Sequence, residues 1–188
     1  MACSMAHTLR GVIRQVALFR GINVGGHNKV RMAELRATFE ALGYANVSSI
    51  IQSGNVCFDS DDDPAAIVAA FRSSVVHEFE VDVPVLLRTR AEIDAALAAH
   101  PFALGATEPK LRYVLLLAEP APVDAAERIG DHTPGSEYAV IGAEIHARYP
   151  NGSARATLGV DVVDRALSTN ATARNLPTVQ KIAVALAG

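Results

Sequence analysis

The sequence predicts an α+β fold built from two α/β units that pack together. The chain has 188 residues and is 50% hydrophobic, so it can bury a substantial core. Apolar stretches of strand length alternate with stretches of helical period. Glycine, asparagine and proline separate these stretches where turns and helix ends are expected. The alternation favours mixed sheets and helices over an all-helical or all-strand protein.

The first half of the chain predicts the order strand, helix, strand, strand, helix, strand. The expected strands cover 13–24, 47–53, 56–59 and 83–88, and the expected helices cover 31–42 and 64–79. Pro64 suits the first turn of the second helix, and Pro84 suggests that the last strand lies at a sheet edge. This order is that of a ferredoxin-like βαββαβ unit with an antiparallel sheet, in which the first and third strands pair.

The second half predicts a second α/β plait that is incomplete or rearranged. Helices are expected over 92–100, 123–129 and 160–167, strands over 111–118, 137–141 and 144–149, and a final helix from Asn175. The expected organisation is a flexible N-terminal tail over 1–12, a first ferredoxin-like plait over 13–90, and a second plait with C-terminal helices over 91–188.

Composition and charge exclude several classes of protein. The net charge is −3, the pI is near 6.1 and there is no tryptophan, which makes nucleic-acid binding unlikely. Cys3 and Cys57 form no disulfide framework, and the histidines lack the spacing of metal ligands, so no metal site is predicted. No segment resembles a signal peptide or a membrane span, and a cytoplasmic location with no membrane partner is therefore expected.

The stretch from Phe19 to Met32 is the best candidate for a functional site. Arg20 follows the buried strand directly, Gly25 and Gly26 permit close backbone approach, and a helix begins after Lys29. Free N–H groups at a helix N-terminus favour an anion, and the lysine adds positive charge. The stretch has neither the Walker nor the dinucleotide-binding spacing, and the alternative interpretation is a tight turn with glycines for steric reasons.

A right-handed crossover would place the turn after the second strand at the same sheet edge as this loop. The candidate ligand-binding residues at that edge are Arg20, Asn23, Gly25, Gly26, Lys29, Gln52, Ser53 and Asn55. Three of them, Asn23, Ser53 and Asn55, have the alternative role of closing turns. The secondary candidates are Arg174, Asn175 and Lys181, of which Asn175 suits a helix cap and Lys181 a solvated surface.

These residues favour the binding of an anionic small molecule or nucleotide at the loop between the first strand and the first helix. No residue set compels an enzymatic function, and the sequence names neither a catalytic group nor a cofactor. The alternatives are a structural or dimerising interaction module, which would make a homodimer possible, and nucleic-acid binding.

Several segments in the same order resemble a widespread bacterial family, domain of unknown function 1697. They are 20–26, 28–30, 32–35, 51–56 and 149–152, followed by Arg174-Asn175, Thr178-Val179 and Lys181. The resemblance implies a pair of ferredoxin-like plaits but no reaction, because the family has no established activity. Leu176 stands where the family usually has tryptophan, and Thr157 stands near a position where lysine is common beside Arg155. Both departures weaken nucleic-acid binding through the C-terminal segment.

Overall fold

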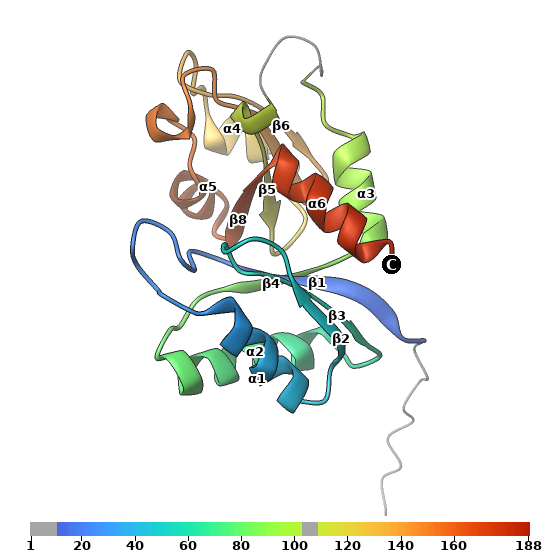
Figure 1. Ribbon diagram of the computed structural model, residues 1–188. Coiled ribbons are helices and arrows are strands. Elements are labelled where there is room, and N and C mark those ends of the chain that lie inside the picture. The colour runs from blue at the N-terminus through green and yellow to red at the C-terminus, as the bar shows by residue number, and fades with distance from the viewer. Residues whose placement is uncertain (1–10, 103–108) are drawn as a thin grey trace, which may run out of the picture.

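The computed structural model describes residues 11–102 and 109–188, which form two four-stranded antiparallel sheets and six α-helices (Figure 1). The strands are β1 (Ile13–Phe19), β2 (Ala45–Ser49), β3 (Asn55–Ser60), β4 (Val85–Thr89), β5 (Arg112–Leu117), β6 (Glu137–Ile141), β7 (Glu144–Arg148) and β8 (Ala171–Asn175). The helices are α1 (Met32–Ala41), α2 (Pro64–Phe79), α3 (Arg90–Ala98), α4 (Ala125–Ile129), α5 (Val160–Leu167) and α6 (Leu176–Leu186). No helix in the described ranges is long and apolar enough to cross a membrane.

The first sheet has the strand order β2-β3-β1-β4. β1 pairs antiparallel with both β3 and β4, which confirms the predicted pairing of the first and third strands. β1 and β2 run parallel to each other because both are antiparallel to β3. β4 lies at an edge, as Pro84 suggested.

The second sheet has the equivalent order β6-β7-β5-β8, so the prediction of an incomplete or rearranged second half is wrong. Strand, helix, strand, strand, helix and strand follow one another as in the first half, and each half continues into a further helix, α3 or α6. The sequence prediction missed β8 at 171–175. Its residues are alanine, threonine, arginine and asparagine, which give no alternating apolar pattern, and α6 follows without an intervening turn.

Two predicted strands end differently from the expectation because the backbone turns earlier. β1 stops at Phe19 rather than at 24, since Gly21 and Asn23 adopt φ values of 69° and 56°. β2 covers Ala45–Ser49 rather than 47–53, since Ile51 and Gly54 adopt φ values of 50° and 70°. Left-handed residues interrupt a strand, and side-chain hydrophobicity does not reveal them.

The core has three parts, separated by the two sheets (Figure 1). α1 and α2 cover the outer face of the first sheet, where Phe19, Phe39 and Phe71 stack. α3 and α6 lie between the sheets and bury Ile93 and Ile182 against residues of both sheets. α4 and α5 cover the outer face of the second sheet. Because the central layer is shared, the two halves bury apolar surface against each other.

Candidate functional site

The loop from 20 to 31 and the turn between β2 and β3 lie at one edge of the first sheet, as the crossover argument predicted. Asn23 joins the two segments through its side chain. Its Nδ2 donates to the carbonyl oxygens of Val30 and Gln52, each at 2.8 Å, while its Oδ1 accepts from the Val30 amide at 2.9 Å. Asn23 therefore has all its side-chain hydrogen bonds inside the protein and holds the base of the loop closed.

The turn is also fixed against the end of β1. The Phe19 amide donates to the Gly54 carbonyl at 2.8 Å. A Cβ added at Gly54 would lie 2.8 Å from the Phe19 Cβ, and the residue has a φ of 70°. Only glycine therefore fits this close crossing without displacement.

The backbone of the loop is held in an uncommon conformation. Positive φ values recur at Gly21, Asn23, Gly25, Gly26 and Asn28. Ile51, in the adjoining turn, has a φ of 50°, which is rare for a β-branched residue. Glycine adopts positive φ without strain and asparagine tolerates it, so Ile51 is the residue of this set whose backbone is strained, at a cost on the order of 1–3 kcal/mol. Such strain is concentrated at functional sites. The hydrogen bonds from Asn23 N to Asn28 O and from Asn28 Nδ2 to Gly21 O keep the loop in this shape.

The same loop is exposed. Val24 is 57% exposed and Ile51 is 42% exposed, while His27 and Lys29 extend into solvent beside them. Within the described residues, neither His27 nor Lys29 has a side-chain hydrogen bond or ion pair. α1 begins at Met32, and its N-cap residue, Arg31, makes no side-chain cap hydrogen bond, so no capping side chain occupies the first amides of the helix. We call Val24, Gly25, Gly26, His27, Lys29, Ile51 and Gln52 the loop site.

Arg20 does not present the free guanidinium that the sequence suggested. It forms ion pairs with Asp161 and Asp164 of α5, and its side chain is 22% exposed. The two carboxylates more than offset its single positive charge and connect the loop to the second half of the molecule. Asp164 also accepts from the Ala171 amide at 2.8 Å, so it is fixed from both sides. The sequence offered no signal for this contact, because the partners are more than 140 residues away.

Asn55 and Arg174 meet at the edge and bury each other. Arg174 Nε donates to Asn55 Oδ1 at 2.5 Å, and an Nη donates to the Phe19 carbonyl at 2.9 Å. Both residues are buried, and burial lowers the pKa of Arg174 to about 10, which leaves it charged at neutral pH. Its N–H groups donate to uncharged oxygens, among them the backbone carbonyl oxygen of Ser53 at 3.2 Å. Asn55, a primary candidate, and Arg174, a secondary one, thus form a hydrogen-bonded joint between the two halves.

The remaining candidates divide into residues with a structural hydrogen bond and residues with an exposed side chain. Asn175 accepts from the Thr178 amide at 3.0 Å and caps α6, which confirms the cap interpretation. Lys181 is exposed on α6. The Ser53 hydroxyl accepts from Asn55 Nδ2 at 3.2 Å, whereas Gln52 has an exposed side chain. Of the predicted set, Gly25, Gly26, Lys29 and Gln52 are the residues open to a ligand.

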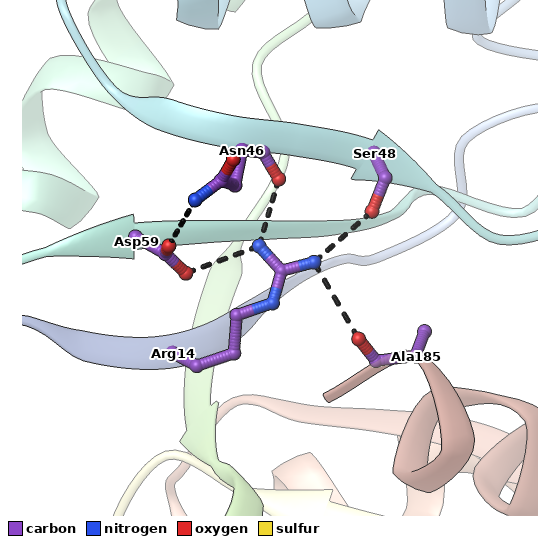
Figure 2. Close-up of polar contacts among 5 residues, drawn as sticks. All are labelled: Arg14, Asn46, Ser48, Asp59 and Ala185. Carbon is purple, nitrogen blue, oxygen red and sulfur yellow. Dashed lines mark hydrogen bonds and ion pairs between the residues drawn. The ribbon is translucent and has the colours of Figure 1, made fainter. Parts of the chain in front are cut away.

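Sequence reasoning missed the arginine that fixes the far end of α6. Figure 2 shows Arg14 of β1 reaching the Asn46 carbonyl at 2.7 Å, Asp59 at 3.1 Å and the Ala185 carbonyl at 3.5 Å. A cation at the last carbonyls of a helix is favourable. Together with the Asn175 cap, Arg14 holds α6 in place at both ends between the two sheets.

Residues 12–146 match the model of a family described as protein of unknown function, DUF1697. The chain belongs to this family. A solved structure titled conserved bacterial protein SP0830 from Streptococcus pneumoniae is similar, with 26% identity and a TM-score of 0.71, over 94% of this chain and 99% of that one. No curated protein matches this DUF1697 chain. Both descriptions leave the biochemical activity open.

Proposed function

We propose that this DUF1697 protein binds an anionic small molecule, with a nucleotide as the favoured class, at the loop site. The observation that carries the proposal is a contrast within one loop. Its backbone is fixed in left-handed conformations by internal hydrogen bonds and adjoins the strained Ile51, yet Lys29 and His27 are exposed and have no side-chain hydrogen bond or ion pair among the described residues. Strain that the fold maintains without burying the side chains is expected where a ligand binds.

The chemistry of the loop site suits a phosphate attached to a partly apolar group. Lys29 and the uncapped start of α1 supply positive charge, and Gly25 and Gly26 let backbone amides approach an anion. Val24 and Ile51 add exposed apolar surface for a base or ring. Arg20 and Asn55 have a supporting role in this proposal, because their polar groups hold the loop and the turn in place.

The test is a calorimetric titration with AMP, ATP, inorganic phosphate and a short oligonucleotide. Binding of AMP or ATP supports the proposal, and Lys29→Glu should weaken it about tenfold or more, since a charge-assisted hydrogen bond contributes about 1.5–3 kcal/mol. Lys110→Glu is the matched control, because it makes the same charge change at an exposed position in the second half. Preference for the oligonucleotide would favour nucleic-acid binding. Loss of affinity in both variants, or in neither, would contradict the loop site.

Each half also has the strand order and connections expected of a ferredoxin-like plait, and we infer that the protein is a tandem pair of such plaits. A structural or dimerising module is the alternative function. Sedimentation of the free protein separates it from the proposal, because a nucleotide-binding monomer needs no second copy.

A further inference from the structure

A pair of histidines, His146 buried and His100 half-buried, lies where α3 ends against the second sheet. The rings of His100 and His146 contact each other edge to face, with centres 5.1 Å apart. His146, on β7, is completely buried. Within the described part of the chain, none of the four ring nitrogens has a hydrogen-bond partner, although the main chain of Tyr113 lies near the His100 ring. Buried polar groups almost always have partners, and each exception calls for an explanation.

The first half of the molecule shows that the fold does not require histidines here. His146 pairs with Val114 as Cys57 pairs with Val16, so His146 and Cys57 occupy equivalent places in their sheets. His100 stands in sequence as far after Thr89, the N-cap of α3, as Leu186 stands after Asn175, the N-cap of α6, although α3 already ends at Ala98. Cys57 and Leu186 both lie in the apolar cluster between the sheets. An apolar pair therefore serves the fold, and two imidazoles without partners reduce its stability.

A cavity of about 370 Å³ adjoins this pair at the junction of α3 and α6. Its lining residues are mostly apolar, with His100 and Gln180 as the polar side chains: Leu97, Ala98, His100, Phe102, Leu176 and Gln180. Apolar walls with a few polar groups, at a volume of about 300–1,000 Å³, are typical of small-molecule sites. The cavity is separate from the loop site, with which it shares no residue.

The charge state of the two histidines limits which class of ligand the cavity can bind. Burial lowers the pKa of His146 to about 4, and burial together with Arg112 lowers the pKa of His100, so both rings are neutral at pH 7. A neutral imidazole has one donor and one acceptor. The ring centres are 5.1 Å apart and no hydrogen bond joins the rings, but rotation of the two side chains that turned one nitrogen of each toward the other would allow one to form. The outer nitrogen of His100 would then serve a ligand.

We propose that this cavity binds a small, neutral ring compound bearing an amide-like donor and acceptor, with His100 as its hydrogen-bonding residue. In this proposal His146 is the positioning residue, because a hydrogen bond from it to the inner nitrogen of His100, formed when the ligand binds, would select the tautomer that the ligand meets. Leu97, Phe102 and Leu176 hold the ring of the ligand. A cationic ligand would lose its hydration here without meeting a carboxylate among the described lining residues, and an anionic one gains little from two neutral imidazoles.

Three probes of nearly the same shape test the charge and the site. Benzamide is neutral, benzamidine is cationic and benzoate is anionic at pH 7.5. In NMR titrations of the full chain, benzamide at millimolar concentration should shift the imidazole ¹⁵N signals of both histidines and the amide signals of Leu97 and Leu176. Benzamidine and benzoate should shift them at least about tenfold less at equal concentration. The absence of a benzamide response, or equal responses to all three, would overturn the proposal.

Substitutions of the two histidines distinguish a role in ligand binding from a role in packing alone. His100→Leu, which introduces the residue found at the equivalent position, should abolish the benzamide response and raise the melting temperature. His100→Asn retains a donor and an acceptor and should keep part of the response. In His146→Cys, the ¹⁵N shifts should report a mixture of His100 tautomers with benzamide present. A lower melting temperature for His100→Leu, or a benzamide response that survives it, would make the pair structural and refute the proposal.

Discussion

The first and second halves of the chain each place an arginine one residue before the cap of the helix that lies between the sheets. Arg174 precedes the Asn175 cap of α6 and reaches the carbonyl of Phe19, the last residue of β1. Arg88 precedes the Thr89 cap of α3 and reaches the carbonyl of Leu117, the last residue of β5, at 2.5 Å. Each half therefore secures the first strand of the other half.

The two arginines differ in the side chain that each meets at the start of the other half's third strand. Arg174 meets the neutral side chain of Asn55, the first residue of β3, at 2.5 Å. Arg88 faces the carboxylate of Glu144, the first residue of β7, at 3.7 Å. Features that recur in both halves belong to the architecture. Features present in one half alone, such as the left-handed loop after β1 and the histidine pair, are where we place function.

Removing the recurring arginine should have the largest effect. Arg174→Ala leaves a cavity and deprives Asn55 and the Phe19 carbonyl of their donor, so unfolding free energy should fall by about 3–5 kcal/mol. Arg88→Ala should cost a comparable amount. Urea unfolding of both variants measures this. Arg90→Ala, at a half-exposed site paired with Asp94, is the control and should change stability by less than about 1 kcal/mol. A small effect at Arg174 would refute the joint between the halves.

The histidine pair should make stability depend on pH in the acid range. The pKa of His146 is lowered from 6.5 to about 4 by burial, so the unfolded state binds the proton first as pH falls. Its contribution is complete above pH 6.5 and should be lost between about pH 6.5 and 4, at a cost of about 3 kcal/mol. Urea midpoints measured across this range test the expectation. His146→Cys, which resembles Cys57, should flatten the profile, and an unchanged slope would contradict it.

Gly54 marks a difference between the two turns that face β1 and β5. The Leu117 amide donates to the Ala143 carbonyl as the Phe19 amide does to Gly54, but Ala143 has no positive φ. Gly54→Ala should cost about 1–3 kcal/mol, because a φ of 70° and the 2.8 Å approach to Phe19 both disfavour a Cβ. Thermal unfolding measures the loss. Gly26→Ala, where a Cβ meets nothing within 4 Å, separates the strain of positive φ from the clash.

The Arg20 ion pairs should have the smallest effect, and the two carboxylates should differ. Asp161 has an 83% exposed side chain, so Asp161→Asn should change stability by less than about 0.5 kcal/mol. Asp164 is 19% exposed and also holds the Ala171 amide, so Asp164→Asn should cost about 1 kcal/mol. Chemical denaturation distinguishes the two. The reverse order would mean that Arg20 is held through the exposed carboxylate.

The sequence predicted the strand order of the first half, and in the second half it located every helix and strand except β8, with β6 at 137–141 and α5 at 160–167 as expected. Apolar periodicity located α1 and α2, and Gly54 with Asn55 located the turn before β3, because these signals are local. β8 escaped detection because its pairing with β5, rather than its own residues, makes it a strand. For the candidate site, glycine and lysine indicated the right loop, whereas the roles of Arg20 and Asn55 depended on Asp161 and Arg174, which lie far along the chain.

By itself, the sequence determined which segments become helices and strands, except for β8, and which loop is rich in glycine and positive charge. These properties follow from side-chain period, capping residues and turn residues, all of which act over a few positions. Tertiary structure decided which polar groups remain available. Packing the halves together around α3 and α6 placed Arg174 on Asn55 and two aspartates on Arg20, and left Lys29 in solvent. The reason is physical: a buried donor or charge must find a partner, and distant segments supplied those partners here.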